Sequence, residues 1–402
     1  MPQQKNEMRH LFLTTIISLF SLTTFAQNTD SVYNTKNSAQ TLIAGKSGNL
    51  LMAAYGEVHY NQGVAANTVQ NGNLDVHRQV LLFGYKFNPK TSFITEIEIE
   101  HIKEVYLEQA FLNYELKPWM NFQGGLLLIP MGIVNEYHEP TTFNGVERPL
   151  IDKVMIPSTW RELGAGFTGN LTSANLRYQV FAVNGPMGYD GDSRLSGKQP
   201  IRSARQKGSE ATMRQPDLST KINYYGIRGL NIGASAYIGT TESTLFDNLQ
   251  TDSAHHVAMA DSSVVNVKMF GLDFRYSRKQ FEARGQMIVG SFSNTPAYNQ
   301  FASSDLGSTA YGYYAECGYD ISKLIKISHK LVPFVRYSNY NTHYETTGET
   351  TTNPSYEQTI ITSGVSLFLD QAFVAKADFQ HSIGGDKATQ NQFNLGLGYW
   401  FR

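Results

Sequence analysis

Apolar and polar side chains alternate one by one along many short segments of this 402-residue chain. The C-terminal segment shows the pattern best, because Phe393, Leu395 and Leu397 alternate with Asn394 and Gly396. Successive side chains of a β-strand point to opposite faces, so a period of two indicates strands whose two faces differ in polarity. The chain is therefore expected to be all-β.

Sixteen segments are expected to form strands. They lie near residues 49–60, 73–87, 91–101, 104–116, 118–128, 160–169, 174–184, 217–225, 229–240, 264–277, 279–292, 309–321, 330–340, 356–369, 373–382 and 391–402. Short and long links alternate between these segments. Two links break the rule, because 102–103 is short where a long link is due and 322–329 is long where a short one is due.

The alternation of link lengths separates two kinds of β protein. Strands of a soluble sandwich also have one polar and one apolar face, but bacterial outer-membrane barrels add an even strand number, short periplasmic turns and longer external loops. The sequence therefore predicts a transmembrane antiparallel β-barrel of about sixteen strands, which is wide enough to leave an aqueous channel.

The first 26 residues have the composition of an export signal. Lys5 and Arg9 precede an apolar stretch at 11–22, and small residues stand just before Gln27. A basic region, a short apolar region and small residues, in that order, are typical of a cleaved secretory signal peptide. We expect the mature protein to begin at Gln27, with residues 27–48 as a short periplasmic lead-in and residues 49–402 as the barrel domain.

Composition narrows the classes of function. The chain has 33 basic and 34 acidic residues, which argues against a nucleic-acid partner. Cys317 is the one cysteine, so an intrachain disulfide and a multi-cysteine metal site are excluded, and its thiol is expected to be packed. Common hydrolase and nucleotide-binding motifs are absent, and the pair His255-His256 lies in a polar link. We expect no enzymatic activity, no catalytic residue, no bound metal and no cofactor.

Charged residues occur inside the predicted strands. A lysine or arginine on the lipid-facing side of a barrel costs about 2–4 kcal/mol near the middle of the bilayer, so these residues should face a water-filled lumen. The expected lumen-lining residues are Arg78, Glu96, Glu98, Glu100, Arg177, Lys221, Arg275, Glu282, Arg284, Arg336, Lys376 and Asp378. Their signs are mixed, so they leave the choice between anions and cations open.

The link at 129–159 differs from the other long links, because it combines an apolar run with paired charges. Burying apolar surface stabilises a protein by about 25 cal/mol per Å², and a solvated loop would forgo that free energy. The link is therefore expected to fold inward and narrow the pore. We also expect Arg148 and Arg161 to pair with Glu147 or Glu162. The expected constriction residues are Glu136, His138, Glu139, Glu147, Arg148, Asp152, Lys153, Arg161 and Glu162.

Three motifs in this region resemble the porin O/P-like family of outer-membrane porins, named for phosphate-selective porins. They are Ile129-Pro130-Met131-Gly132, Glu147-Arg148-Pro149 and the segment from Arg161 to Gly164. The resemblance implies a homotrimeric, sixteen-stranded barrel whose third external loop folds inward.

The expected function is passive diffusion through the bacterial outer membrane. The partners would be outer-membrane lipid and small hydrophilic solutes or ions, including anions such as phosphate. An alternative is a surface adhesin or receptor that uses the barrel as an anchor and binds through the links at 185–216 and 241–263. A barrel-embedded hydrolase is a third class, but it needs a nucleophile and base, or an acidic pair, at one rim.

Overall fold

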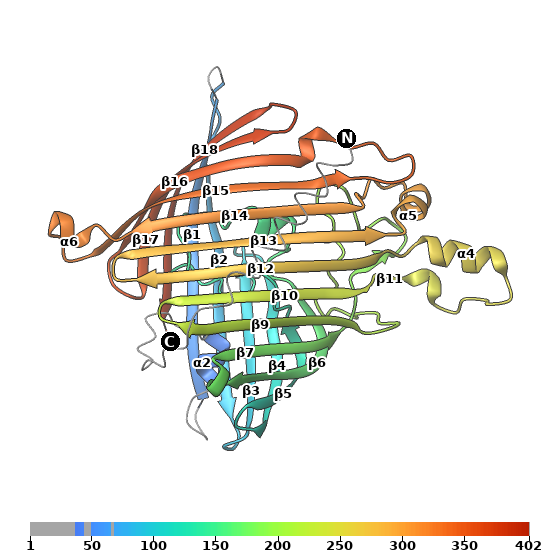
Figure 1. The fold of residues 1–402 in the computed structure, drawn as a ribbon, viewed down its shortest axis with the longest axis horizontal. Coiled ribbons are helices and arrows are strands. Elements are labelled where there is room, and N and C mark those ends of the chain that lie inside the picture. Colours follow the sequence, from blue (N-terminus) through green and yellow to red (C-terminus); the bar gives the residue numbers. More distant parts are fainter. Residues whose placement is uncertain (1–36, 44–49, 66–67, 402) are drawn as a thin grey trace, which may run out of the picture. The chain divides into compact units, whose positions relative to one another are not determined.

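The computed structural model describes residues 37–43, 50–65 and 68–401, and sixteen of its strands form a closed antiparallel barrel (Figure 1). These strands are β1 (Leu50–Val64), β2 (Asn73–Lys86), β3 (Thr91–Glu100), β4 (Glu104–Lys117), β5 (Met120–Leu128), β6 (Arg161–Leu171), β7 (Leu176–Val183), β9 (Asp217–Ile227), β10 (Leu230–Thr240), β12 (Asn266–Arg278), β13 (Phe281–Ser293), β14 (Thr309–Tyr319), β15 (Lys330–Glu345), β16 (Glu357–Phe368), β17 (Phe373–Gly384) and β18 (Thr389–Phe401). Each pairs with the next one along the chain, and β1 pairs with β18 to close the sheet.

The predicted fold class and strand count are confirmed. The main boundary errors lie at the ends of β1 and β15, which continue to Val64 and Glu345 instead of ending near residues 60 and 340. From Asn61 to Gly63 both faces of β1 carry polar or small residues, yet the pairing with β18 continues to Val64↔Asn391. Backbone pairing thus extends beyond the alternating residues from which the strand was predicted.

Short helices and a small parallel sheet are present in addition to the strands of the barrel wall. They are α2 (Ser38–Ile43), α3 (Ile151–Val154), α4 (Ala254–Ser262), α5 (Thr295–Ala302), α6 (Ser322–Ile325), the 3₁₀ turns η1 (Thr172–Ala174), η2 (Thr244–Phe246) and η3 (Pro354–Tyr356), and strands β8 (Met187–Tyr189) and β11 (Glu242–Ser243). Helices α4 and α5 lie at one end of the barrel and α6 at the other (Figure 1). Within the described part of the chain, every helix is too short or too polar to cross a membrane.

The predicted signal peptide at 1–26 lies outside the described residues. Of the predicted lead-in, residues 37–43 are described, and they contain α2, which packs on β1, β2 and β3 with Ala39 and Leu42 buried.

The two faces of the sheet differ as predicted. On β3, Phe93 is exposed whereas Glu96 and Glu98, on the opposite face, are buried. Because the sheet is closed, the buried face is the interior of the barrel. The expected packing of Cys317 is wrong, since this residue lies on the outward face of β14 and is exposed. An outward side chain of a single-layered barrel has no second protein layer above it.

Candidate functional site

The twelve charged strand residues predicted for the lumen all lie away from the exposed face. Glu100, Arg177 and Glu282 are half-buried, and the other nine are buried. Further buried strand acids, absent from the prediction, pair with these residues. Glu57 contacts Arg78, Asp273 contacts Lys221, and Glu316 contacts both Arg284 and Arg336.

Segment 129–160, the link between β5 and β6, is the most buried of the long links. Lys153 is its one exposed residue. Its apolar side chains are at most 2% exposed at Ile129, Met131 and Ile133, and they belong to the main apolar cluster of the protein. The apolar run therefore packs against protein, as its composition predicted.

One contact of segment 129–160 is with β9 and β7. The Lys221 ammonium donates to the Gly132 carbonyl at 2.6 Å and to the Glu136 carboxylate at 2.7 Å, and Gln179 donates to the same carboxylate. Burial alone would raise the pKa of Glu136, but the Lys221 charge outweighs it and the pKa is lowered.

A second set of contacts involves Arg284, Arg336 and Lys376 on β13, β15 and β17, here called the basic wall. These cations donate to backbone carbonyls of the segment. Arg336 donates to the Asn144 and Glu147 carbonyls at 2.5 and 3.2 Å, and Lys376 donates to the Phe143 carbonyl at 2.8 Å. Arg284 donates to the Thr142 carbonyl at 2.5 Å.

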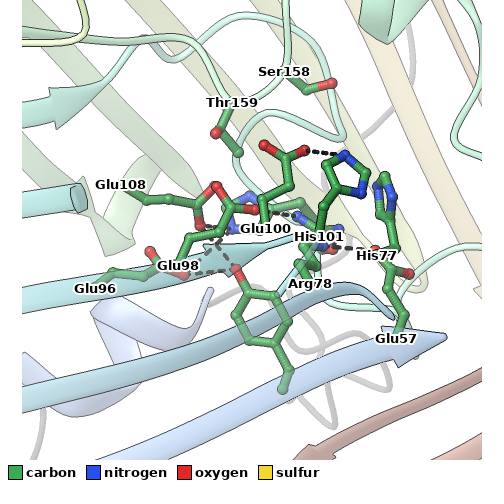
Figure 2. Close-up of polar contacts among 12 residues, drawn as sticks. Glu57, His77, Arg78, Glu96, Glu98, Glu100, His101, Glu108, Ser158 and Thr159 are labelled. Carbon is green, nitrogen blue, oxygen red and sulfur yellow. Dashed lines mark hydrogen bonds and ion pairs between the residues drawn. The ribbon is translucent and has the colours of Figure 1, made fainter. Parts of the chain in front are cut away.

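The third set involves Glu57, Glu96, Glu98 and Glu108 on β1, β3 and β4, here called the acidic wall. Figure 2 shows these four carboxylates around Arg78. The His138 Nε2 atom of the segment lies 3.5 Å from Glu96 and 3.6 Å from Glu108. Burial alone would lower the pKa of His138, but the carboxylates of Glu108 and Glu96 outweigh it and raise the pKa to about 9. His138 is therefore an imidazolium at neutral pH.

Glu139 and Asp152 also have partners within the protein. The backbone N–H of Ser38 in α2 donates to Glu139 at 3.3 Å, so the lead-in helix contacts the segment. Gln286 on β13 donates to Asp152 at 2.9 Å, and burial raises the Asp152 pKa to about 7.

The predicted pairing of Arg148 and Arg161 with neighbouring glutamates is wrong. Glu147 lies 3.3 Å from the His59 ring and accepts from Asn61 at 2.9 Å. Burial would raise the pKa of Glu147, but His59 outweighs it and holds that pKa at about 2.

The two guanidinium groups and Glu162 have other environments. Arg161 donates to the Thr159 hydroxyl at 3.0 Å, and Asn184 donates to Glu162 at 2.8 Å. The Arg148 Nε and Nη2 atoms are buried but make no hydrogen bond to the described residues. Side chains adjacent in sequence point apart here, which the motif could not reveal.

A polar cavity of about 550 Å³ lies between the acidic wall and the end of segment 129–160. One side carries acidic and imidazole groups and the other carries guanidinium and ammonium groups. Its charged and imidazole lining residues are Arg78, Glu98, Glu100, Glu104, His77, His101, Arg148, Arg161, Arg202, Arg205 and Lys207. Figure 2 shows the acidic side, with Ser158 and Thr159 drawn above it.

Arg202, Arg205 and Lys207 were missed by the sequence prediction. They belong to the link at 184–216, which lies against segment 129–160, because Arg205 donates to the Pro157 carbonyl at 3.1 Å and Arg202 to the Lys153 carbonyl at 3.3 Å. Burial, followed by the charges of Arg202 and Arg161, lowers the Arg205 pKa to about 9. The sequence signal that could have indicated them is the presence of three cationic residues within six positions.

Comparison with known proteins bears on the fold. No family model matches the chain. It is 27% identical over 370 residues to an uncharacterized protein of Aquifex aeolicus (strain VF5), covering 87% of this chain and 79% of the relative. Similar solved structures include the outer membrane channel DcaP of Acinetobacter baumannii, with 12% identity and a TM-score of 0.59 over 89% of this chain and all of that one.

Two further solved structures have a similar fold. Salmonella typhi OmpF has 10% identity and a TM-score of 0.58, and the anion-selective porin from Comamonas acidovorans has 9% identity and a TM-score of 0.56. Each covers 88% of this chain, and 97% and 99% of the respective neighbour is matched. The chain has the barrel fold of outer-membrane porins. Identities this low concern the fold, so the function has to be argued from the site.

Proposed function

We propose that the protein is a passive diffusion channel of the bacterial outer membrane for small hydrophilic solutes, and that segment 129–160 forms its constriction. One observation carries the proposal. The segment contacts interior side chains on strands all around the barrel, among them Arg78, Lys221 and Arg336, yet a polar cavity of about 550 Å³ remains beside it. In a fully plugged barrel, side chains would fill that space.

The outward face supports a membrane location. Large apolar side chains such as Leu272, Leu395 and Leu397 are 43–60% exposed there, far more than a water-soluble surface ordinarily presents in one band. Aromatic residues near the short turns, including Phe87, Tyr114 and Phe167, are exposed as well, as expected for an interfacial girdle. A cleaved export signal at 1–26 and a homotrimer belong to the same proposal.

Anions are the favoured solutes. The cavity has six arginine and lysine side chains against three glutamates, and one of those arginines, Arg78, is paired with Glu57 at 2.6 Å. The lowered pKa of Arg205 follows in part from neighbouring cations, so positive charge is crowded where the solute would pass. A small anion such as phosphate would relieve that repulsion and accept hydrogen bonds from Arg148.

The test is the conductance of purified protein in a planar lipid bilayer. Deletion of residues 135–150 should raise single-channel conductance and weaken discrimination by solute size, because it removes the part of the segment that contacts both walls. Deletion of residues 247–252, in a largely exposed part of the link between β10 and β12, is the matched control and should leave conductance unchanged.

The outcomes separate the parts of the proposal. Absence of conductance from folded wild-type protein would contradict a channel and favour the receptor alternative. If the 135–150 deletion folds and conducts like wild type, the segment does not form the constriction. A reversal potential in a salt gradient that indicates cation selectivity would refute the anion preference alone.

A further inference from the structure

We propose that Asp75, His77 and His101 form a binding site for a divalent transition-metal ion such as Zn²⁺ at the rim of the channel. Their donor atoms lie within 4.8 Å of one another. Both histidines also line the 550 Å³ cavity, so an ion can reach them from the aqueous interior.

A β-bulge brings His77 to this position. Glu57 of β1 pairs with Arg78 and Val58 pairs with Val76, so His77 has no partner opposite it. The extra residue breaks the alternation, and His77 therefore lines the cavity together with its neighbour Arg78. Bulges frequently re-aim a side chain beside a functional site. Asp75, two residues before His77, lies on the same face.

A tight turn brings in the second imidazole. His101 and Ile102 connect β3 to β4 with φ angles of 52° and 68°, the left-handed region that a branched residue such as isoleucine rarely adopts. The His101 backbone N–H donates to the His77 carbonyl at 3.3 Å, which keeps the turn beside the bulge. Local backbone strain is thus retained where the two rings meet.

The donor geometry suits one ion. The Nδ1 atoms of His101 and His77 lie 2.6 and 3.6 Å from the same Asp75 oxygen, Oδ2. Metal–ligand bonds of about 2.0–2.2 Å in a tetrahedral site place donor atoms about 3.3–3.6 Å apart, so both Asp75–imidazole distances are within about an ångström of those in a formed site. Three protein ligands leave the fourth position to water or a solute.

The ligand set selects the class of metal. Two imidazoles and one carboxylate suit Zn²⁺, Ni²⁺ and Cu²⁺, whereas Ca²⁺ and Mg²⁺ prefer all-oxygen sites. A surrounding shell of groups is also present. The Glu100 carboxylate lies 3.9 Å from His101 Nε2, and the His59 ring stacks on His77 at 4.6 Å between centroids. A carboxylate that hydrogen-bonds the other nitrogen of a ligating imidazole fixes its orientation and raises its basicity, and Glu100 lies about an ångström beyond hydrogen-bonding distance. One of the dashed lines in Figure 2 joins Glu100 to the His101 ring and marks this contact.

Binding of Zn²⁺ to purified protein tests the site by isothermal titration calorimetry. Wild type should bind one equivalent. His77→Gln, His101→Asn and Asp75→Asn should each weaken binding at least about tenfold, because even outer-shell partners of metal sites change affinity by about 10–100-fold. Asparagine tolerates the left-handed conformation at residue 101, so that variant preserves the turn. The double variant His255→Asn/His256→Asn, in exposed α4, is the control for surface histidines and should bind like wild type.

The result also separates this site from the channel proposal. Correct folding of each variant is checked by heat-modifiable migration in SDS gels. Equal Zn²⁺ affinity in wild type and the three folded variants, or loss of binding in the α4 control alone, would overturn the site whatever the conductance. If the protein is a channel, Zn²⁺ adds positive charge beside Glu98 and Glu100 and should shift the reversal potential further toward anions, and the His101→Asn variant should not respond.

Discussion

The basic wall and the acidic wall hold the same segment by different chemistry. Arg284, Arg336 and Lys376 donate to its backbone carbonyls, whereas the acidic wall meets the segment's own side chain, His138. Every residue has a carbonyl, so these hydrogen bonds depend on the strand cations and little on the sequence of the segment. Part of the attachment to the acidic wall comes from one imidazolium, and that part depends on pH.

Arg336→Ala should lower the free energy of unfolding most, because Arg336 is the central residue of the basic wall. The guanidinium is 2% exposed, pairs with Glu316 at 2.7 Å and donates to two segment carbonyls. Removing one partner of a buried ion pair typically costs about 3–5 kcal/mol. Urea unfolding in detergent should show that loss, and single-channel recordings should become noisier.

Arg228→Ala is the control for Arg336, since Arg228 is exposed in the turn between β9 and β10. Its free energy of unfolding should be within about 0.5 kcal/mol of wild type, as for most surface substitutions. Equal stability of the two variants would show that the basic wall does not hold the segment.

Raising the pH should have the second largest effect, because it weakens the attachment of the segment to the acidic wall. The His138 pKa is raised from its ordinary value of 6.5 to about 9, so the stability it contributes is fully present below pH 6.5 and is lost as pH rises through about 9. Each pKa unit corresponds to about 1.4 kcal/mol, so a loss on the order of 3 kcal/mol is expected. Urea midpoints measured between about pH 6 and about pH 10 should fall in that window.

The variant His138→Gln identifies the group responsible. Glutamine cannot carry the charge, so the variant should already be destabilised at neutral pH and should lack the step near pH 9. If the step persists in the variant, another group causes it and the assignment to His138 is wrong.

Lys376→Met should have a smaller effect on the basic wall. The ammonium donates to the Phe143 carbonyl at 2.8 Å and lies 3.8 Å from the centre of the Phe143 ring, and methionine retains most of the side-chain volume. Hydrogen bonds to charged groups contribute about 1.5–3 kcal/mol, so a loss of about 2 kcal/mol is expected in the same unfolding measurement. A loss as large as that of Arg336→Ala would contradict this order.

The comparison also explains what the sequence could predict. Alternation and link lengths predicted the closed barrel, and the apolar run predicted that segment 129–160 packs on protein, because both depend on polarity patterns that a sequence records directly. The sequence could not predict which residues of the segment contact the basic wall, because the acceptors are backbone carbonyls, which every residue has. His77 and Glu108 were missed because each lies in a bulge, at β2 and β4, where the alternation slips by one residue.

Arg148→Ala should have the smallest effect on stability and a clear effect on permeation. Its Nε and Nη2 atoms make no hydrogen bond to the described residues, so little native structure is lost with the side chain, and the free energy of unfolding should change by less than about 1 kcal/mol. The guanidinium nevertheless lines the cavity, where its charge acts on a passing ion. The reversal potential in a salt gradient should therefore move toward cations.

Lys198→Ala removes an equal charge from an exposed position in the link at 184–216 and should leave the reversal potential unchanged at physiological salt, where charges beyond about 8 Å are screened. If both variants shift the potential equally, the effect comes from the overall charge of the loops. If neither shifts it, Arg148 lies outside the ion path and the cavity beside the acidic wall is not the constriction. A shift confined to Arg148→Ala would show that the Arg148 guanidinium acts on the passing ion from within the cavity.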